Sequence, residues 1–275
     1  MTTLHPADAA ALLVDTAEKG GSAAVATLLS GDGAAGSRMA WVETPAGEPR
    51  VEGSVGTEPV DQAVAELLRE ELANPRAGDG LRKLEVEGAA LELYLEIRHP
   101  VLELVVVGAG HVAQPLAHVG ALLGFRVTVI DDRPDFATRE RFPDAHRVLR
   151  ADFEDPFRDT PLHQRSHLLL VTRGHKYDYA CLLIALRMDP PPAYIGMIGS
   201  RRRVRATYLQ LLEEGIDREL LDRIHAPVGL DVGAETPEEI AISVAAELVM
   251  LRRGGTGASL KDVERVADRF FKEAE

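Results

Sequence analysis

The stretch VLELVVVGAGHVAQPLAHVGALLGFRVTVIDD occupies residues 101–132 and decides the fold. It starts with a short, mostly apolar run, 102–107, that ends in three β-branched valines and is typical of a strand buried on both faces of a parallel sheet. Apolar residues then recur at helical spacing from Val112 to Leu123, and Gly124 fits the position just after a helix. A second apolar strand follows and ends at Asp131. The stretch therefore predicts a β-α-β unit.

The turn between the first strand and the helix reads GAGHVA at residues 108–113 and fits the pattern G-x-G-x-x-G/A. Gly108 allows a tight turn, Gly110 lets a phosphate approach the backbone, and Ala113 lets the helix pack closely on the strand. Asp131 follows Gly108 by 23 residues, where an acid is expected to bind ribose hydroxyls. These features predict a Rossmann-type nucleotide or phosphate site. The alternative is that the glycines serve packing alone.

One residue of this helix departs from the ideal pattern. Pro115 is expected about one turn into the helix, where it would forfeit a backbone hydrogen bond.

Composition limits the classes of partner. The 275 residues carry 44 acidic and 31 basic side chains, a net charge of −13, which argues against non-specific binding of nucleic acid. Any anion site must then be a local basic cluster. With one cysteine, Cys181, the chain can form neither an internal disulfide nor a thiolate zinc cluster, and no metal site is predicted. Cys181 is expected in the core.

The chain shows neither a signal-peptide pattern nor an apolar run of membrane-spanning length, so we expect a cytoplasmic protein without a membrane partner. Two domains are expected, an α+β domain at residues 1–99 and an α/β Rossmann-like domain at residues 100–275. His99-Pro100 marks the boundary, because a residue before proline favours extended structure. In the first domain we expect a helix that starts near His5 and buries Ala11, Leu12 and Val14.

The rest of the first domain reads as strands at residues 23–29, 38–43 and 50–55, a helix at residues 58–73, and a hairpin at residues 81–86 and 91–97.

Two later strands also run into polar loops. The strand at residues 167–171 is followed by Thr172 and His175. The strand at residues 193–198 is followed by Gly199 and Ser200, a good N-cap, and then by Arg201, Arg202 and Arg203. Arginines in the first turn oppose the helix dipole, and this pattern in an acidic chain predicts an anion site. The alternative is that they pair with acidic residues, and at least one of them could do so.

In an open α/β sheet, ligands bind outside the carboxyl ends of the strands. The loops above all follow strands, so we expect them to converge on one ligand. Replacing the arginine that contacts a phosphate should weaken binding with little loss of stability. The expected contact residues are Gly108, Ala109, Gly110, His111, Val112, Asp131, Asp132, Arg133, Thr172, His175, Gly199, Ser200, Arg201 and Arg202.

Two helices close the chain. Thr236, Pro237 and Glu239 form the signature of a capping box, and the helix they start is expected to bury Ile240, Val244, Leu248 and Leu251. A last amphipathic helix at about residues 260–271, with Leu260, Val263, Val266 and Phe270 on one face, could close the core or form a dimer contact. We expect a homo-oligomer.

Five motifs, in this order, carry a resemblance to a known family. They are GAGHVA, TVIDDRP, VTRGHKYDYACL, YIGMIGSRRR and HAPVGLDVGAETPEEIA, which lie between residues 108 and 241. In this order they resemble the xanthine dehydrogenase accessory proteins, the XdhC/CoxI family. The resemblance implies a molybdenum-cofactor chaperone that binds the cofactor, protects it during sulfuration and delivers it to a molybdenum hydroxylase such as xanthine dehydrogenase.

The resemblance is weaker in the first domain. The family has a glycine-rich motif with a cysteine there, whereas this chain has Gly53-Ser54-Val55-Gly56-Thr57-Glu58-Pro59-Val60-Asp61, with Pro59 in the place of the cysteine and Asp61 in the place of a glutamate. The loop lacks the thiolate that would suit molybdenum or sulfur transfer.

Two functions remain open at this point, beside the plainer alternative of a regulatory or structural protein with an empty Rossmann pocket. The first is a chaperone for molybdenum cofactor (molybdopterin) or a related nucleotide, which is not an enzyme in the usual sense. The second is an NAD(P)-dependent oxidoreductase with His111 or His175 as its catalytic proton-transfer group. If a dinucleotide binds, Asp131 predicts that NAD binds more tightly than NADP, although Arg133 could accept the additional phosphate of NADP.

Overall fold

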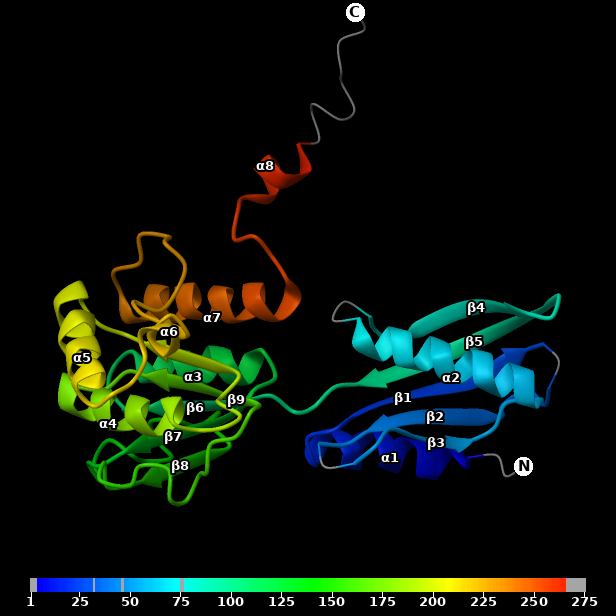
Figure 1. Cartoon of the computed structure of the whole chain (residues 1–275), viewed down its shortest axis with the longest axis horizontal. Coiled ribbons are helices and arrows are strands. Elements are labelled where there is room, and N and C mark those ends of the chain that lie inside the picture. Colours follow the sequence, from blue (N-terminus) through cyan, green and yellow to red (C-terminus); the bar gives the residue numbers. More distant parts are fainter. Residues whose placement is uncertain (1–3, 32, 46, 75–76, 266–275) are drawn as a thin grey trace, which may run out of the picture. The chain divides into compact units, whose positions relative to one another are not determined.

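The protein forms two compact units, Met1–Val101 and Leu102–Glu275 (Figure 1). The structure is a computed structural model that describes residues 4–31, 33–45, 47–74 and 77–265. The break between the units follows Val101, one residue after His99-Pro100. Within the described ranges, no helix has both the length and the apolar character needed to cross a lipid bilayer.

The first unit is a five-stranded antiparallel sheet with one helix on each face. Its strands β1 (Ser22–Ser30), β2 (Arg38–Glu43), β3 (Arg50–Gly53), β4 (Gly80–Val86) and β5 (Ala89–Arg98) lie in the order β3-β2-β1-β5-β4. The central strand β1 is buried on both sides. Ala23 and Val25 face α1 (Pro6–Glu18), and Ala24 and Ala26 face α2 (Glu58–Ala73). The predicted α+β arrangement is confirmed.

The buried face of α1 differs from the expectation. The helix buries Ala9, Leu13, Thr16 and Ala17, whereas Val14 is 55% exposed. The buried positions recur at spacings of three and four residues and include two alanines, which let the helix lie close to the sheet. The run of neighbouring apolar residues in the sequence therefore led to a wrong prediction of which face of the helix is buried.

The second unit is a six-stranded parallel sheet. Its strands are β6 (Glu103–Val107), β7 (Arg126–Asp131), β8 (Arg147–Arg150), β9 (Ser166–Leu170), β10 (Tyr194–Met197) and β11 (Ile224–His225). They lie in the order β11-β10-β9-β6-β7-β8, and every neighbouring pair is parallel. Read from the other edge, this is the 3-2-1-4-5-6 order of dinucleotide-binding domains. The predicted Rossmann-like sheet is confirmed.

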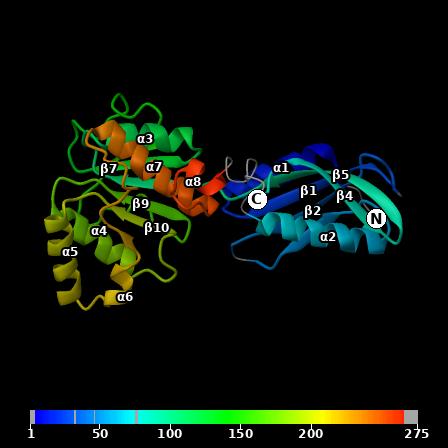
Figure 2. The same ribbon diagram turned by 90° about the horizontal axis from the view of Figure 1, so that it is seen from above.

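Helices cover both faces of this sheet, as Figure 2 shows. α3 (Ala113–Leu122) and α7 (Pro237–Arg253) pack on one face, and α4 (His175–Leu186) and α5 (Arg201–Glu213) pack on the other. The short helices α6 (Arg218–Leu221) and α8 (Leu260–Glu264) complete the described chain.

In the helices of this unit, Pro115 and Leu251 differ from the expectation, and the capping box is as expected. Because α3 begins at Ala113, Pro115 lies in the first turn, where the N–H groups lack partners within the helix, so its position costs no helical hydrogen bond. The capping box of Thr236 and Glu239 is present. Leu251, expected in the core, is 47% exposed because it falls outside the buried stripe of α7.

The last helix is shorter in the structure than expected. α8 ends at Glu264 and buries none of its residues, with Leu260 at 74% and Val263 at 41% exposure. Val266 and Phe270 lie outside the described residues.

Cys181 lies in α4 and is fully buried, as expected for a core residue. Burial, followed by the nearby Asp178 carboxylate, raises the pKa of its thiol well above the usual value. Thiol reagents react with the thiolate, so the folded protein should react very slowly with an aromatic disulfide reagent and rapidly only after unfolding in denaturant. Complete reaction of the native protein within seconds would contradict this expectation.

Candidate cofactor site

The parallel sheet brings the polar loops to one edge. Loops that follow β6, β7, β9 and β10 all leave the carboxyl ends of their strands, so they lie along the same side of the sheet. The chain reverses its direction of winding between β6 and β9, and the crevice at such a point is where this fold binds ligands. These loops therefore lie at one edge of the sheet, whereas their convergence on one ligand stays a prediction.

The turn after β6, residues 108–113 and hereafter the glycine loop, uses its two glycines differently. Gly108 has φ +106°, and a Cβ there would lie 2.6 Å from the carbonyl oxygen of Val171. Gly110 has no atom within 4 Å of the position that a Cβ would occupy. Gly108 is thus required by packing, whereas Gly110 keeps a space open above the backbone, as a phosphate-binding turn requires.

Some backbone N–H groups of the glycine loop have no acceptor within the protein. The N–H of Gly108 is bonded to the carbonyl oxygen of Ile130 and that of Ala109 to the carboxylate of Asp131. Among the hydrogen bonds of the described residues, none uses the N–H groups of Gly110, His111 or Val112. These donors lie immediately before α3, at the positive end of the helix dipole, an arrangement suited to an anion.

The carboxylate of Asp131 forms its hydrogen bonds within the protein. Its side chain is 2% exposed, and its two oxygens accept hydrogen bonds from Ala109 N, Arg133 N, Arg133 Nε and Arg133 Nη2, at 2.7–3.0 Å. A carboxylate has about four acceptor positions, so a ribose hydroxyl would have to displace one of these donors. The preference for NAD over NADP gains no support from this geometry and stays a prediction.

The charge of Asp131 contributes to stability. Burial favours a higher pKa, but the hydrogen bonds from Arg133 and Ala109 outweigh it and hold the pKa of Asp131 well below its ordinary value. A depressed folded-state pKa stabilises the fold above the unfolded-state pKa, about 3.9, and the contribution fades as the pH falls below it.

Replacement of Asp131 by asparagine should reveal this contribution. We expect Asp131→Asn to lower the free energy of unfolding by about 2 kcal/mol at pH 7, because donors lose a charged acceptor. The difference in Tm from the wild type should shrink below about pH 4. Thermal unfolding followed by circular dichroism at pH 7, 5 and 3 measures it; an undiminished difference at pH 3 would show that the carboxylate charge is not the cause.

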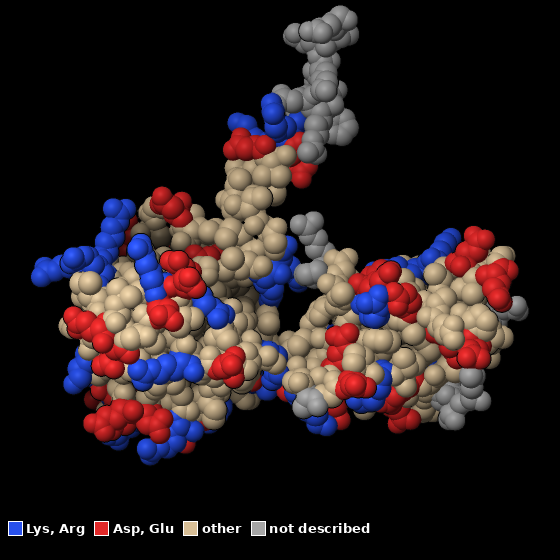
Figure 3. Space-filling view, in the orientation of Figure 1, with Lys and Arg blue, Asp and Glu red and all other residues tan. Residues whose placement is uncertain are grey.

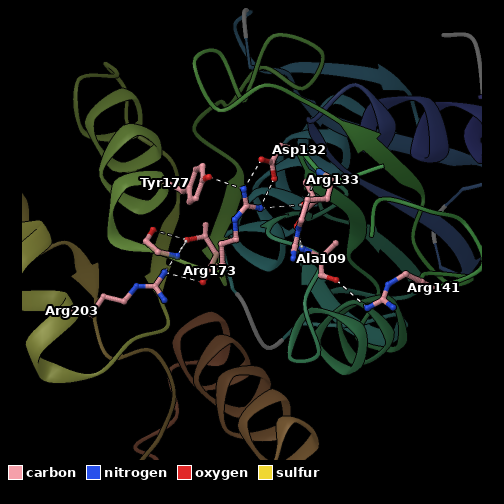
Figure 4. A network of polar contacts seen from close by, with 10 residues as sticks. Ala109, Asp132, Arg133, Arg141, Arg173, Tyr177 and Arg203 are labelled. Carbon is pink, nitrogen blue, oxygen red and sulfur yellow. Dashed lines mark hydrogen bonds and ion pairs between the residues drawn. The ribbon is translucent and has the colours of Figure 1, made fainter. Parts of the chain in front are cut away.

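A polar bridge joins the loops on either side of the glycine loop. Arg173, after β9, makes two 2.7 Å hydrogen bonds to the carboxylate of Asp132, after β7. Arg173 also donates to the Tyr177 hydroxyl at 2.7 Å, with its guanidinium 4.5 Å from the centre of that ring. Figure 4 shows Arg173 between Tyr177 and Asp132. Because β6 lies between β7 and β9, this bridge spans the carboxyl end of the strand that carries the glycine loop.

Two further guanidinium groups adjoin the glycine loop. Arg133 and Arg141 lie over the ring of Phe136, 3.6 Å and 4.9 Å from its centre. Arg141 Nη2 donates to the carbonyl oxygen of Ala109 at 3.3 Å, and its buried Nε has no hydrogen-bond partner among the described residues (Figure 4). With Arg173, they form the local basic cluster that an anion site in an acidic chain requires.

The arginines after β10 do not act as one cluster. Arg203 turns inward and pairs with Asp178, a residue of α4 that is 0% exposed, and its Nη2 also donates to the oxygens of Thr172. Burial raises the pKa of Asp178, although Thr172 and Arg203 oppose the rise. The expectation that the phosphate-contacting arginine can be replaced with little loss of stability therefore stays a prediction for the exposed Arg201 and Arg202, whereas the buried contacts of Arg203 argue against it for that residue.

The remaining expected site residues are dispersed. Thr172 Oγ1 donates to Asp178 at 2.7 Å, and Ser200 Oγ caps α5 by accepting from Arg203 N. His111 and His175 are exposed, and no hydrogen bond of the described structure orients either ring. A Cβ at Gly199 would contact Arg203 at 3.2 Å, so this glycine makes room for that side chain.

The HAPVGLD motif after α6 is ordered by a buried carboxylate. Glu247 of α7 accepts hydrogen bonds from the Tyr194 hydroxyl and from Gly229 N at 2.9 Å, and it pairs with His225 at 3.0 Å. Across the described ranges, no group of three or more His, Cys, Asp or Glu side chains is arranged to hold a metal ion.

Sequence reasoning did not single out Arg173, Tyr177 or Arg141. Arg173 lies between two expected site residues, and Tyr177 follows it by four positions at the start of a helix, which is a usual spacing for side-chain pairs. No local signal points to Arg141, because its contact with Ala109 spans 32 residues.

A family model described as the XdhC Rossmann domain matches residues 104–248. The chain belongs to the XdhC family. The matched region holds the whole parallel sheet except the first residue of β6, together with the glycine loop and the Arg173 bridge. The resemblance stated from the five motifs is thereby confirmed for the second unit.

Two known proteins are similar to part of the chain. An uncharacterized protein of Escherichia coli, YqeB, is 34% identical over 62% of this chain and 31% of its own length. A probable xanthine dehydrogenase subunit from Bacillus subtilis is 32% identical over 58% of this chain and 46% of its own length. The XdhC chain therefore matches less than half of either relative.

The crystal structure of a xanthine dehydrogenase from Bacillus halodurans shares the fold. Its TM-score with this XdhC chain is 0.52 at 19% sequence identity, over 96% of this chain and 99% of that one.

In the first unit, the loop that replaces the family's cysteine motif is held by its own residues. Pro59 lies in the first turn of α2, and the Asp61 carboxylate accepts hydrogen bonds from the N–H groups of Val55 and Gly56 at 2.9 and 3.1 Å. The single thiol of the chain, Cys181, is buried in the other unit. This XdhC chain therefore brings no thiol to the loop.

Proposed function

We propose that the second unit binds the phosphate of a molybdenum cofactor, or of a closely related nucleotide, at the glycine loop. We further propose that the protein assists the maturation of a molybdenum hydroxylase. The observation that carries the first part is the open space at Gly110, in a loop whose N–H groups at residues 110–112 have no other partner in the described structure. The family membership and the name of the Bacillus subtilis relative support the second part.

The residues present fit the phosphate end of such a cofactor. The N–H groups of residues 110–112 would hold phosphate oxygens, and Arg133, Arg141 and Arg173 offer charge-assisted hydrogen bonds beside them. The cofactor, when bound, would supply a metal centre for the redox chemistry of the client enzyme. The chain's own part is to bind and orient the phosphate group, which a preformed backbone turn does without a large loss of side-chain entropy.

Asp132 would compete with a phosphate ligand for the guanidinium of Arg173. Its carboxylate takes two of the five N–H donors of Arg173 and offsets the charge of the guanidinium, so an incoming phosphate competes with Asp132 for that arginine. A phosphate dianion is a stronger competitor than a carboxylate monoanion. The bridge would therefore favour phosphate ligands over the more abundant carboxylate metabolites.

Calorimetric titration with AMP and with inorganic pyrophosphate tests the site. We expect saturable 1:1 binding to the wild type, and tighter binding of about tenfold by Asp132→Asn, which releases Arg173. Arg173→Ala should weaken binding by a similar factor. Asp135→Asn is the matched control, because it removes a charge from the same loop at a residue that forms no ion pair with Arg173 in the described structure. Affinities that are equal in all four proteins would contradict a phosphate site at the glycine loop.

The alternative function, an NAD(P)-dependent oxidoreductase, is not favoured by any contact at the site. A proton-transfer histidine is normally oriented by a hydrogen bond to its second nitrogen. Neither candidate histidine, His111 or His175, has such a contact in the described structure.

A further inference from the structure

A second concave surface lies apart from the glycine loop, between α5 and α6. It is an open groove of about 440 Å³, and its lining includes no residue of the glycine loop. One wall is a stripe of α5 that includes Arg201, Arg205, Leu209 and Leu212, and the other wall includes Arg218 of α6. We name it the α5–α6 groove.

The floor of the α5–α6 groove is apolar and partly exposed. Leu209 and Leu212 are 44% and 43% exposed, whereas Leu211 of the same helix is buried in the core. The groove-lining stripe from Arg201 to Leu212 covers 11 residue steps, which is ~16 Å of helix. About three turns of another helix could lie along a stripe of this length.

The rim of the groove carries arginines without carboxylate partners. Among the described residues, Arg201, Arg205 and Arg218 form no ion pair, although the chain has 44 acidic side chains against 31 basic ones. Glu213 and Glu219, which are close in the sequence, do not line the groove. Figure 3 shows Lys and Arg side chains projecting where Figure 1 draws α5.

We infer that the α5–α6 groove is a docking site for an acidic amphipathic helix of a partner protein. Leucines of the partner would cover the apolar floor, and its carboxylates would meet the three arginines at the rim. A small-molecule site usually encloses most of its ligand, whereas this groove is open and its leucines face outward. Arg and Tyr are also enriched in protein interfaces, and Tyr208 lies in the lining. This inference does not depend on what the glycine loop binds.

Fluorescence anisotropy with two labelled peptides tests the inference. The acidic peptide, of about 16 residues, forms an amphipathic helix with a leucine stripe flanked by glutamates, and the basic peptide has lysine at each glutamate. We expect saturable binding of the acidic peptide to the wild type at low salt, and at least tenfold weaker binding by Arg205→Glu or by Leu209→Ser. Arg202→Glu is the matched control, because Arg202 is exposed on the same helix but does not line the groove.

A variant with reversed charges in the groove tests whether the arginines select an acidic partner. Arg205→Glu/Arg218→Glu should bind the basic peptide more tightly than the acidic one, which would also show that this variant is folded. The inference is wrong if the wild type does not bind the acidic peptide, if Arg202→Glu weakens binding as much as Arg205→Glu, or if the double variant does not reverse the preference. Displacement of the peptide by millimolar AMP would instead assign the groove to small phosphate ligands and overturn a protein docking site.

Discussion

Replacing Arg203 by alanine is expected to lower the free energy of unfolding of the second unit by about 3–5 kcal/mol. The substitution leaves the fully buried carboxylate of Asp178 without its cation, and breaking a buried ion pair by removing one partner has a cost of this size. For a unit of this length, the Tm should fall by roughly 10 °C. Differential scanning calorimetry of the whole chain measures the effect.

Two controls separate the ion pair from other effects of the substitution. Arg202→Ala, at the exposed neighbouring position, should change the free energy of unfolding by under about 0.5 kcal/mol. The double variant Arg203→Ala/Asp178→Asn should recover part of the loss, because the buried group is then neutral and can still bond Thr172. If Arg203→Ala unfolds at the same temperature as the wild type, the arginine is not needed to hold Asp178.

Replacing Gly110 by valine is expected to abolish phosphate binding with little change in stability. The valine side chain would enter space that holds no protein atom within 4 Å of the new Cβ, and the backbone of Gly110 does not have a positive φ. The same side chain would keep a phosphate from the N–H groups beyond it. Loss of about two charge-assisted hydrogen bonds amounts to at least about 3 kcal/mol, or a hundredfold in affinity.

Gly108→Ala is the contrasting variant. Its φ of +106° and the 2.6 Å approach to Val171 make an alanine strained at this position, so the Tm should fall. Calorimetric titration with AMP and thermal unfolding should therefore separate the two glycines, one required by the fold and one by the ligand. A Gly110→Val protein that binds AMP like the wild type would remove the glycine loop from the site.

Much of the backbone could be predicted because the signals are local. Strand, glycine turn, helix and terminal acid succeed one another within residues 101–132, and the parallel sheet then places the loop that follows each strand at the same edge. The capping box of α7 was readable for the same reason, since its two residues are three positions apart.

The partners of the charged side chains could not be read in this way. Arg203 finds Asp178 across 25 residues and Arg173 finds Asp132 across 41, and these separations are bridged only when strands pair. Asp131 differs, because Arg133 is only two residues away, yet the sequence did not indicate that bonds from Arg133 and Ala109 would fill its acceptor positions. Charge and spacing indicated where an anion site would lie, but not which arginines serve it.

Mass spectrometry of the freshly purified protein under native conditions tests the central claim most directly. We predict that a ligand with at least one phosphate remains bound to the purified wild-type protein and that its mass matches a pterin phosphate or its nucleotide. The Gly110→Val protein should lack this ligand. A ligand without phosphate, or one that both proteins retain equally, would contradict the claim that the glycine loop holds the phosphate of a molybdenum-type cofactor.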